Sequence, residues 1–255
     1  MTLFHSKKDI DRAMTRDLHT SVDGRGLQHH KYVKVHNWVR SGTKLLSGRG
    51  FRHAVQLRAG TLTTSSRSAR GRPDASPWCD ACRRQIGSLG HILQTCERTH
   101  DARIKRHDAV VDRIASVCEK KGLNVLKERP IPTPGGIRKP DLIVYDGTRA
   151  VVIDATIVAD SAILSEAHRL KVEYYDNNAI RAGVASLTGV AASNIEFSSA
   201  TFNWRGAMAK ASSECLRSLR IGAYEQEILS IKVVEGSYLV YSTFQRSTWR
   251  APTRR

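Results

Sequence analysis

The stretch RKPDLIVYDGTRAVVIDATIV, residues 138–158, decides the fold of this 255-residue chain. It contains two runs rich in Val, Ile and Leu, residues 138–145 and 149–158, joined by Asp146-Gly147. Asp-Gly between two such runs is a strong signal for a tight hairpin turn. The stretch therefore predicts two adjacent antiparallel strands, and the second is typical of a central strand that is buried on both faces.

Elements on either side extend this pattern. A helical period over 102–121 is followed by Gly122 as a stop signal. We further expect a strand over 124–131, a helix over 165–182, a strand over 195–204 and a helix over 208–219, whereas the element type of 225–244 stays open. The order begins α-β-β-β-α-β, without an internal repeat, and predicts an α/β fold.

A cluster of cysteine and histidine residues precedes this region. Its pattern, Cys79-x2-Cys82-x8-His91-x4-Cys96, supplies three thiolates and one imidazole, which can close a tetrahedral zinc site. We therefore predict a structural Zn2+ ion that folds the local loop and takes no part in catalysis. The alternative is a set of buried free cysteines beside a core histidine. The two remaining cysteines fall on predicted helices and are expected in the core.

The chain is strongly basic. It has 41 Lys and Arg against 24 Asp and Glu, a formal net charge of +17 and a pI of about 10.1. Such an excess points to a polyanionic partner, and nucleic acid is the leading candidate. No run approaches the roughly 18 apolar residues of a spanning helix, and no signal peptide opens the chain. We therefore expect a soluble intracellular protein without a membrane partner.

The positive charge is concentrated in residues 24–73, which contain no acidic residue. Tyr32, Trp38 and Phe51 lie between the cations and could stack on bases, although core positions are the alternative. Residues 61–77 are expected to be irregular. The candidate nucleic-acid contacts, here and further along the chain, are Lys31, Lys34, Arg40, Arg49, Arg52, Arg58, Arg67, Arg70, Arg72, Arg83, Arg84, Arg138 and Lys139.

Two aspartates in the opening stretch form the candidate catalytic centre. Asp141 follows a proline, and Asp154 ends the apolar run 150–153, where a buried charge needs a cation or a metal. Two carboxylates on paired strands can hold one Mg2+ or Mn2+ ion, which lowers the pKa of a bound water for attack on phosphorus. The alternative is that Asp141 caps a turn and Asp154 forms a salt bridge with an arginine.

The helix predicted over 165–182 adds two candidates. Lys171 and Tyr175 share a face beside an apolar stripe that would pack on the sheet. That packing brings Lys171 towards the aspartates, where it could stabilise a phosphate or position the attacking water, with Tyr175 as support. Taken alone, Lys171 is an ordinary solvated lysine. Glu128 or Glu119 could supply a further acidic group.

Asp141 after a proline, Asp154 after twelve intervening residues and a nearby lysine resemble the PD-(D/E)xK nucleases, the fold of many type II restriction enzymes. In that family the lysine lies two residues after the second acid, but Thr156 occupies this place, so the role would pass to Lys171. This shift, the upstream Cys-Cys-His-Cys knuckle and the Arg-Lys-Pro-Asp motif resemble the C-terminal region of non-LTR retrotransposons that insert into large-subunit ribosomal RNA genes. The likeness includes a basic linker over 38–71 and Asn-Trp-Arg-Gly at 203–206.

The resemblance implies a PD-(D/E)xK restriction-endonuclease-like mixed sheet flanked by helices and preceded by a CCHC zinc knuckle and a basic linker. The expected ranges are 1–72 for the linker, 73–100 for the knuckle and 101–255 for the nuclease domain. The chain has no acidic doublet typical of a reverse transcriptase. We therefore expect the polymerase upstream in a longer protein, or a truncated copy of the element.

The implied function is a metal-dependent endonuclease that nicks double-stranded chromosomal DNA, a ribosomal RNA gene, so that the 3′ hydroxyl primes reverse transcription. Element RNA is a second expected partner, and a chromosomal substrate implies a nuclear location. The alternative is a zinc-stabilised nucleic-acid clamp whose nuclease fold is inactive. The acidic pair separates the two hypotheses, because a clamp gains nothing from buried aspartates beside a phosphate.

Overall fold

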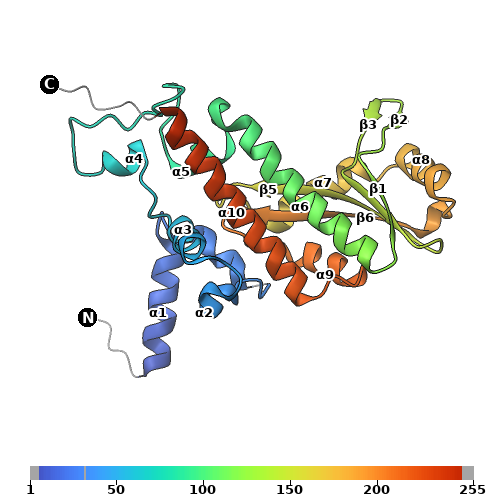
Figure 1. Ribbon diagram of the computed structural model, residues 1–255, viewed down its shortest axis with the longest axis horizontal. Helices are drawn as coiled ribbons and strands as arrows, with labels where there is room; N and C mark the ends of the chain where they lie inside the picture. The colour runs from blue at the N-terminus through green and yellow to red at the C-terminus, as the bar shows by residue number, and fades with distance from the viewer. Residues whose placement is uncertain (1–5, 32, 249–255) are drawn as a thin grey trace.

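The computed structural model describes residues 6–31 and 33–248, apart from the side chain of Lys31 (Figure 1). The described helices are α1 (Lys7–Thr20), α2 (Trp38–Ser41), α3 (Gly48–Arg58), α4 (Ser65–Ser68), α5 (Leu89–Gln94), α6 (His100–Lys120), α7 (Leu164–Tyr175), α8 (Asn178–Thr188), α9 (Lys210–Ser218) and α10 (Ala223–Thr248). The described strands are β1 (Asn124–Lys127), β2 (Ile131–Thr133), β3 (Gly136–Arg138), β4 (Leu142–Tyr145), β5 (Ala150–Val158) and β6 (Ile195–Asn203). No described helix combines the length and the apolar character needed to cross a membrane.

The main sheet has the strand order β1-β4-β5-β6. β1 pairs with β4 and β4 with β5 in antiparallel fashion, whereas β5 pairs with β6 in parallel. The predicted hairpin between β4 and β5 is confirmed: Asp146 Oδ1 accepts the Thr148 N–H at 3.1 Å, and Gly147 has a φ of +85°. The first six residues of β5 are buried, as expected of a central strand.

Helices cover both faces of this sheet. Figure 1 shows α6 and α10 running side by side across it. Val151 and Ile153 pack in the core under α6, α9 and α10, whereas Val152 packs with residues of α8 on the opposite face. Because side chains alternate along a strand, Asp154 projects to the same face as Val152, the face that carries α7 and α8.

The linker and the knuckle share a core with the last helix. Trp38 and Leu57 from the linker, Ile92 from the knuckle and Phe244 from α10 are almost fully buried in one apolar cluster. α10 packs against α3, α5 and α6, and so contacts all three predicted segments of the chain. The predicted mixed α/β fold is therefore present, with the cysteine cluster held against it.

Three predicted elements are corrected by the structure. The strand expected over 138–145 begins only at Leu142, because Arg138 belongs to β3 of the small two-stranded ribbon. The strand expected over 124–131 ends at Lys127, because Glu128 has a φ of +48°, and Ile131–Thr133 instead forms a separate ribbon with β3. The helix expected over 165–182 is two helices. Asn177 begins α8 by accepting the Ile180 N–H at 3.1 Å, since an asparagine favours a helix cap over a helix interior.

Two further segments differ in how regular they are. Residues 225–244, whose element type the sequence leaves undecided, lie within the 26-residue helix α10. The connector expected over 61–77 is irregular except for the single turn of α4. The helices expected over 102–121 and 208–219 and the strand over 195–204 are present, with ends that differ by one or two residues.

Candidate functional site

The four predicted zinc ligands lie together. The ligand atoms of Cys79, Cys82, His91 and Cys96 are all within 4.8 Å of one another. Cys79 Sγ and Cys96 Sγ are 3.9 Å apart, and Cys82 Sγ lies 3.4 Å from His91 Nε2. Two sulfurs bound at about 2.3 Å to one tetrahedral ion would lie about 3.8 Å apart. The cluster therefore has the dimensions of a closed zinc site, and its cysteines are free rather than paired in a disulfide.

Local structure orients the histidine of this cluster. Ser88 caps α5 by accepting the His91 N–H at 3.1 Å, which fixes the start of the helix that carries the ligand. His91 Nδ1 lies 2.9 Å from Thr95 Oγ1, so its Nε2 is left to face the thiols. A hydrogen bond to the second ring nitrogen is the usual way in which a protein aims a histidine at a metal.

The electrostatics of the cluster suit a cation. The backbone N–H of Arg84 lowers the pKa of the Cys82 thiol and so favours its thiolate. Burial raises the pKa of Cys96 to about 11, because a thiolate in the interior lacks solvent. A divalent cation among the four ligands would offset that cost and hold the thiols ionised.

Asp141 and Asp154 face each other at the end of the β4–β5 ladder. Leu142 pairs with Ile153, so the next step of this antiparallel register sets Asp141 opposite Asp154. Asp141 is 9% exposed and Asp154 is 5% exposed. Asp141 Oδ2 accepts the Ala155 N–H at 2.7 Å, which joins the two strands where the ladder stops. The structure thus brings the two predicted carboxylates together in a buried position.

Lys171 and Tyr175 reach the same place from α7. Lys171 Nζ lies 2.7 Å from Asp154 Oδ2, while its side chain stays 39% exposed. The Tyr175 hydroxyl donates to the Lys139 carbonyl at 3.3 Å and also interacts with Asp154. Burial, followed by the charge of Asp141, raises the pKa of Asp154, and Lys171 opposes this rise. Burial also raises the pKa of Tyr175, so this phenol is a neutral donor.

His107 of α6 belongs to this site but was not predicted. Its Nε2 lies 3.1 Å from Asp141 Oδ2 and 3.2 Å from the Ala155 carbonyl oxygen, and its Nδ1 lies 3.1 Å from Asp108 Oδ1. The hydrogen bond to Asp141 is the main reason why the pKa of His107 is raised to about 9. A signal existed in the sequence, since His107 precedes Val110 and Val111 by three and four residues and so lies beside the buried stripe of its helix.

The carboxylate site opens into a cleft of about 380 Å³. Asp154 and Lys171 line one side, and Thr156, at the position of the usual family lysine, lines the same cavity. α6 contributes His100, Arg103 and Arg106. Asp154 is the member of the acidic pair that lines this cleft, and a carboxylate beside cationic side chains can hold a divalent ion close to a phosphate.

The two further acidic candidates lie apart from the pair. The Glu128 carboxylate is exposed and lies 2.8 Å from Lys139 Nζ. Glu119 is exposed near the end of α6, twelve residues and about 18 Å of helix beyond His107. The structure therefore places neither carboxylate beside Asp141 and Asp154.

Arg58 was expected to contact nucleic acid, but the structure gives it another place. It is 8% exposed, its guanidinium lies 4.9 Å above the Trp38 ring, and its Nη2 lies 2.8 Å from His30 Nδ1. Burial lowers the pKa of Arg58 to about 9. Because this guanidinium has its partners inside the linker core, Arg58 is a structural residue in this conformation.

The other candidate cations differ in how far they are paired. Within residues 6–31 and 33–248, the exposed side chains of one group form no ion pair with another described residue: Lys34, Arg40, Arg49, Arg52 and Arg72. A second group lies against acids or an aromatic ring, namely Arg67 and Arg70 on Asp23, Arg83 on Asp80, Arg84 on Glu97, Lys139 on Glu128 and Arg138 over Tyr174. The candidate residues Lys31, by its side chain, and Tyr32 lie outside what the structure describes.

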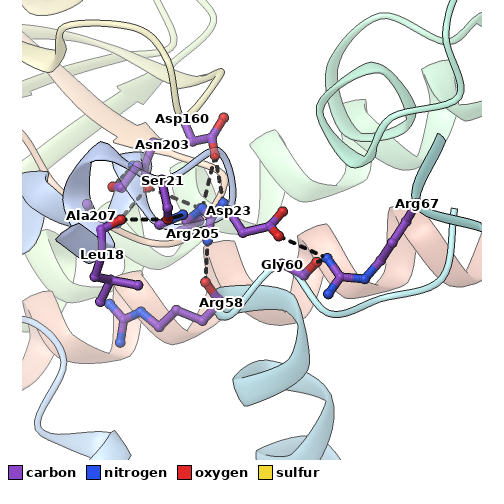
Figure 2. Close-up of polar contacts among 12 residues, drawn as sticks. Leu18, Ser21, Asp23, Arg58, Gly60, Arg67, Asp160, Asn203, Arg205 and Ala207 are labelled. Atoms are coloured by element: carbon purple, nitrogen blue, oxygen red, sulfur yellow. Dashed lines mark hydrogen bonds and ion pairs between the residues drawn. The ribbon is translucent and has the colours of Figure 1, made fainter. Parts of the chain in front are cut away.

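The turn after β6 joins the linker to the sheet. Figure 2 shows Arg205 between Asp160 and the backbone of Arg58. Its Nε and Nη2 donate to Asp160 Oδ2 at 3.0 and 2.8 Å, and its Nη1 donates to the Arg58 carbonyl. Asn203 Nδ2 donates to the Gly26 carbonyl at 3.0 Å. Since Asp160 follows the strand that carries Asp154, these bonds fix the linker close to the carboxylate site.

A mixed sheet with paired buried carboxylates, preceded by a Cys3His cluster, defines a mixed α/β protein with a cluster compatible with a zinc knuckle. The chain belongs with the Pol polyproteins of R2-type retrotransposable elements, of which it matches a C-terminal region. No family model matches it.

Three relatives show the extent of this match. The chain is 35% identical over 241 residues to the Retrovirus-related Pol polyprotein from type-2 retrotransposable element R2DM of Drosophila melanogaster, over 94% of the chain and 23% of that protein. It is 30% identical over 254 residues to the type-1 element R2 polyprotein of Nasonia vitripennis, over 98% and 25%. It is 33% identical over 230 residues to that of Bradysia coprophila, over 89% and 26%. The chain thus spans about a quarter of the length of these relatives.

Proposed function

We propose that the chain is a metal-dependent DNA endonuclease that nicks chromosomal target DNA and so provides the 3′ hydroxyl from which a retrotransposon's reverse transcription starts. One observation carries the proposal. Two buried aspartates stand opposite each other at the end of a strand ladder, and Lys171 Nζ lies 2.7 Å from one of them at the side of a cationic cleft.

The residues of this site have separate tasks. Asp141 and Asp154 would hold a Mg2+ or Mn2+ ion, which supplies an activated water and neutralises charge on the phosphate. Lys171, whose side chain is 39% exposed, can turn from Asp154 to a phosphate oxygen of the strand. His107 holds Asp141 Oδ2 and leaves the other carboxylate oxygen for the ion. Tyr175 fixes the end of α7 by its bond to the Lys139 carbonyl.

The remaining parts of the proposal concern partners. The exposed cations of the linker would bind the phosphates of double-stranded DNA, and the Cys3His cluster would bind one structural Zn2+. A ribosomal RNA gene as target, element RNA as second partner and a nuclear location rest on the family resemblance. The reverse transcriptase is proposed to lie in the part of the full protein that this chain does not span.

The second candidate is a nucleic-acid clamp with an inactive nuclease fold. It is favoured by the internal pairing of both acids, since Lys171 contacts Asp154 and His107 contacts Asp141. Carboxylates paired in this way could serve the fold alone. The two candidates differ in what a divalent ion does, because an ion must displace part of this pairing before catalysis can begin.

The deciding experiment is nicking of supercoiled plasmid by the purified chain in Mg2+ or Mn2+, beside Asp154→Ala. The matched control is Glu214→Gln, which removes an exposed carboxylate on α9. We expect nicking by the wild type and the control and none by Asp154→Ala. Metal dependence is tested by leaving Mg2+ out while the zinc content is measured, because a chelator would remove both ions.

Equal nicking by the wild type and Asp154→Ala would refute the nuclease assignment of this site. Tight DNA binding by a wild type that does not nick would establish the clamp for the isolated chain. Loss of nicking in Glu214→Gln would show that the effect of removing a carboxylate is not specific to the site. The Asp154→Ala result would then not support the nuclease assignment.

A further inference from the structure

A second cavity, of about 480 Å³, lies where the linker, the knuckle and the nuclease-like part meet. Its walls come from linker residues 22–25 and 60–70, knuckle residues 85–95 and the two turns at 159–161 and 204–205. The volume falls within the roughly 300–1,000 Å³ of typical small-ligand sites. Arg205 forms part of the wall, so the contacts in Figure 2 also shape this cavity.

One side of the cavity is cationic. Arg67 Nη1 and Arg70 Nη1 lie 3.2 and 3.0 Å from Asp23 Oδ2, and Arg70 Nη2 lies 3.3 Å from Asp23 Oδ1. Arg25 also lines the cavity and forms no ion pair with any residue that the structure describes. The lining holds four arginines against two aspartates, an excess of two positive charges. Guanidinium groups converging on one carboxylate have a geometry that also suits a phosphate.

The other side is mainly apolar and includes the side chain of Gln94. Leu62, Ile86 and Leu89 line it beside Trp204. Within the described part of the chain, neither Gln94 Nε2 nor the 2%-exposed Trp204 Nε1 has a hydrogen-bond partner. Gln94 Oε1 accepts from Arg106 Nη2 at 3.3 Å, so the amide is already oriented. Both of these nitrogen atoms are covered by protein atoms, so a ligand acceptor could reach the Gln94 amide only if that side chain turns.

These features match the chemistry of a nucleotide. The cations suit its phosphate, the apolar wall suits a base face, and the Gln94 amide, once turned towards the cavity, suits an acceptor on the base edge or sugar. Gln94 lines both this cavity and the cleft that holds Asp154 and Lys171, so the two spaces adjoin. A strand with one phosphate in the cleft could therefore place a nearby nucleotide in the cavity.

We propose that this junction cavity receives one unstacked nucleotide of the nucleic-acid strand that enters the cleft. The proposal rests on the proposed function for the presence of a strand, and adds a site that selects its conformation. Because unstacking a paired base costs a few kcal/mol, the cavity should favour a strand with an unpaired base over a perfect duplex.

The test measures binding of the full chain, without Mg2+, to a DNA duplex with one unpaired 2-aminopurine and to the fully paired duplex. We expect about tenfold tighter binding of the unpaired probe, with a change in 2-aminopurine fluorescence. Gln94→Ala and Arg70→Ala should each remove this preference, measured as the ratio of the two affinities, whatever change either variant makes to paired-duplex binding. The control Arg217→Ala, on α9 near the start of β5, should keep it. Thermal melts show that each variant is folded.

Single-stranded DNA, single-stranded RNA of the same sequence and a free mononucleotide are the further probes. Binding of either strand that depends on Gln94 and Arg70 supports the site and shows which sugar it prefers. Competition by the mononucleotide as strong as by the strands would overturn the link to the cleft. No preference in the wild type, or an unchanged preference in both variants, would overturn the cavity proposal, even if plasmid nicking is intact. If the chain prefers the unpaired probe but does not nick plasmid, the cavity proposal stands and the proposed nuclease function is refuted.

Discussion

The cysteine cluster and the carboxylate pair are both suited to a cation, but they treat charge differently. In the cysteine cluster the four ligand atoms lie within 4.8 Å of one another, so each ligand faces the other three. In the carboxylate pair each acid faces a basic side chain, His107 for Asp141 and Lys171 for Asp154, and Asp154 lines a cleft. The thiols and the imidazole thus have one another as neighbours, whereas each carboxylate already has a basic side chain as its partner.

Under the proposed function, we expect this difference to correspond to two kinds of metal chemistry. A closed set of four ligands leaves no position for water or substrate and can only stabilise the local fold. An open pair whose basic partners can turn towards solvent or phosphate is able to exchange an ion, a water and a strand. Removing charge should therefore harm the first site through stability and the second through activity.

The largest effect is expected from Cys96→Ser, which breaks the closed set. Structural zinc contributes about 10–16 kcal/mol in zinc-finger peptides, so the knuckle should lose its ordered structure. We expect zinc to fall from one ion per chain towards none, and the segment around residues 78–99 to become sensitive to protease. Cys215→Ser, a half-buried cysteine outside the cluster, is the control and should keep its zinc. Full zinc content in Cys96→Ser would contradict the closed site.

Asp154→Asn should separate activity from stability. Loss of a metal ligand worth several kcal/mol lowers nicking by about 10³-fold or more. Burial raises the pKa of Asp154, so its favourable contribution to folding is complete below its ordinary pKa and is lost as the pH rises through the folded value. At neutral pH without Mg2+ the variant should therefore melt no lower than the wild type, because it carries no buried charge.

The same melting experiment sharpens the contrast with the zinc cluster. Adding Mg2+ should raise the melting temperature of the wild type and leave that of Asp154→Asn unchanged, since only the wild type binds the ion at this site. A variant that melts well below the wild type in metal-free buffer would show that the carboxylate supports the fold, as a structural ion pair does.

His107→Gln should have an intermediate effect on activity. Groups that orient metal ligands typically contribute 10- to 100-fold, roughly, to metal affinity or activity. We expect nicking to fall within that range and to need a higher Mg2+ concentration, because Asp141 loses the group that holds its Oδ2. His19→Gln on α1 is the matched control. An unchanged Mg2+ requirement would exclude His107 as a positioning residue.

The smallest effect is a pH dependence of stability in metal-free buffer. The pKa of His107 is raised to about 9, so the bond to Asp141 stabilises the fold fully below the ordinary histidine pKa of about 6.5 and is lost as the pH rises through 9. The melting temperature should fall by a few degrees across this window in the wild type. His107→Gln should lack this fall. If the melting temperature of both proteins depends on pH in the same way, the stabilising role of the His107–Asp141 bond is refuted.

The elements nearest the site were the most predictable from the sequence. The hairpin at Asp146-Gly147, the buried run before Asp154 and the helix face of Lys171 depend on local chemistry, namely turn propensity and side-chain period. The cysteine cluster was equally predictable from the sequence, because its four ligands lie close together along the chain. These signals are local in the chain, so no long-range packing was needed to read them.

Three features could not be predicted from the sequence, because tertiary packing decides them. The break between α7 and α8 depends on Asn177 acting as a cap, which competes with a helical period that continues through it. His107 reaches Asp141 across 34 residues, and Arg58 reaches its carbonyl contact with Arg205 across 147 residues. Charge composition in the linker could not show that one of its arginines lies inside a core. The role of a residue was thus predictable where it depends on its neighbours in the sequence. It was not predictable where it depends on contacts between distant segments.

The position of α10 has a consequence for how the chain folds during synthesis. This helix is made last among the described elements, yet it packs against α3 of the linker and α5 of the knuckle. Both early segments therefore emerge from the ribosome long before the surface that completes their core. Their apolar residues, Trp38 and Leu57 among them, therefore lack that surface until α10 has been made. A zinc ion bound at the proposed site would restrain the knuckle before α10 is made, so we expect zinc supply during translation to affect how much of the chain folds correctly.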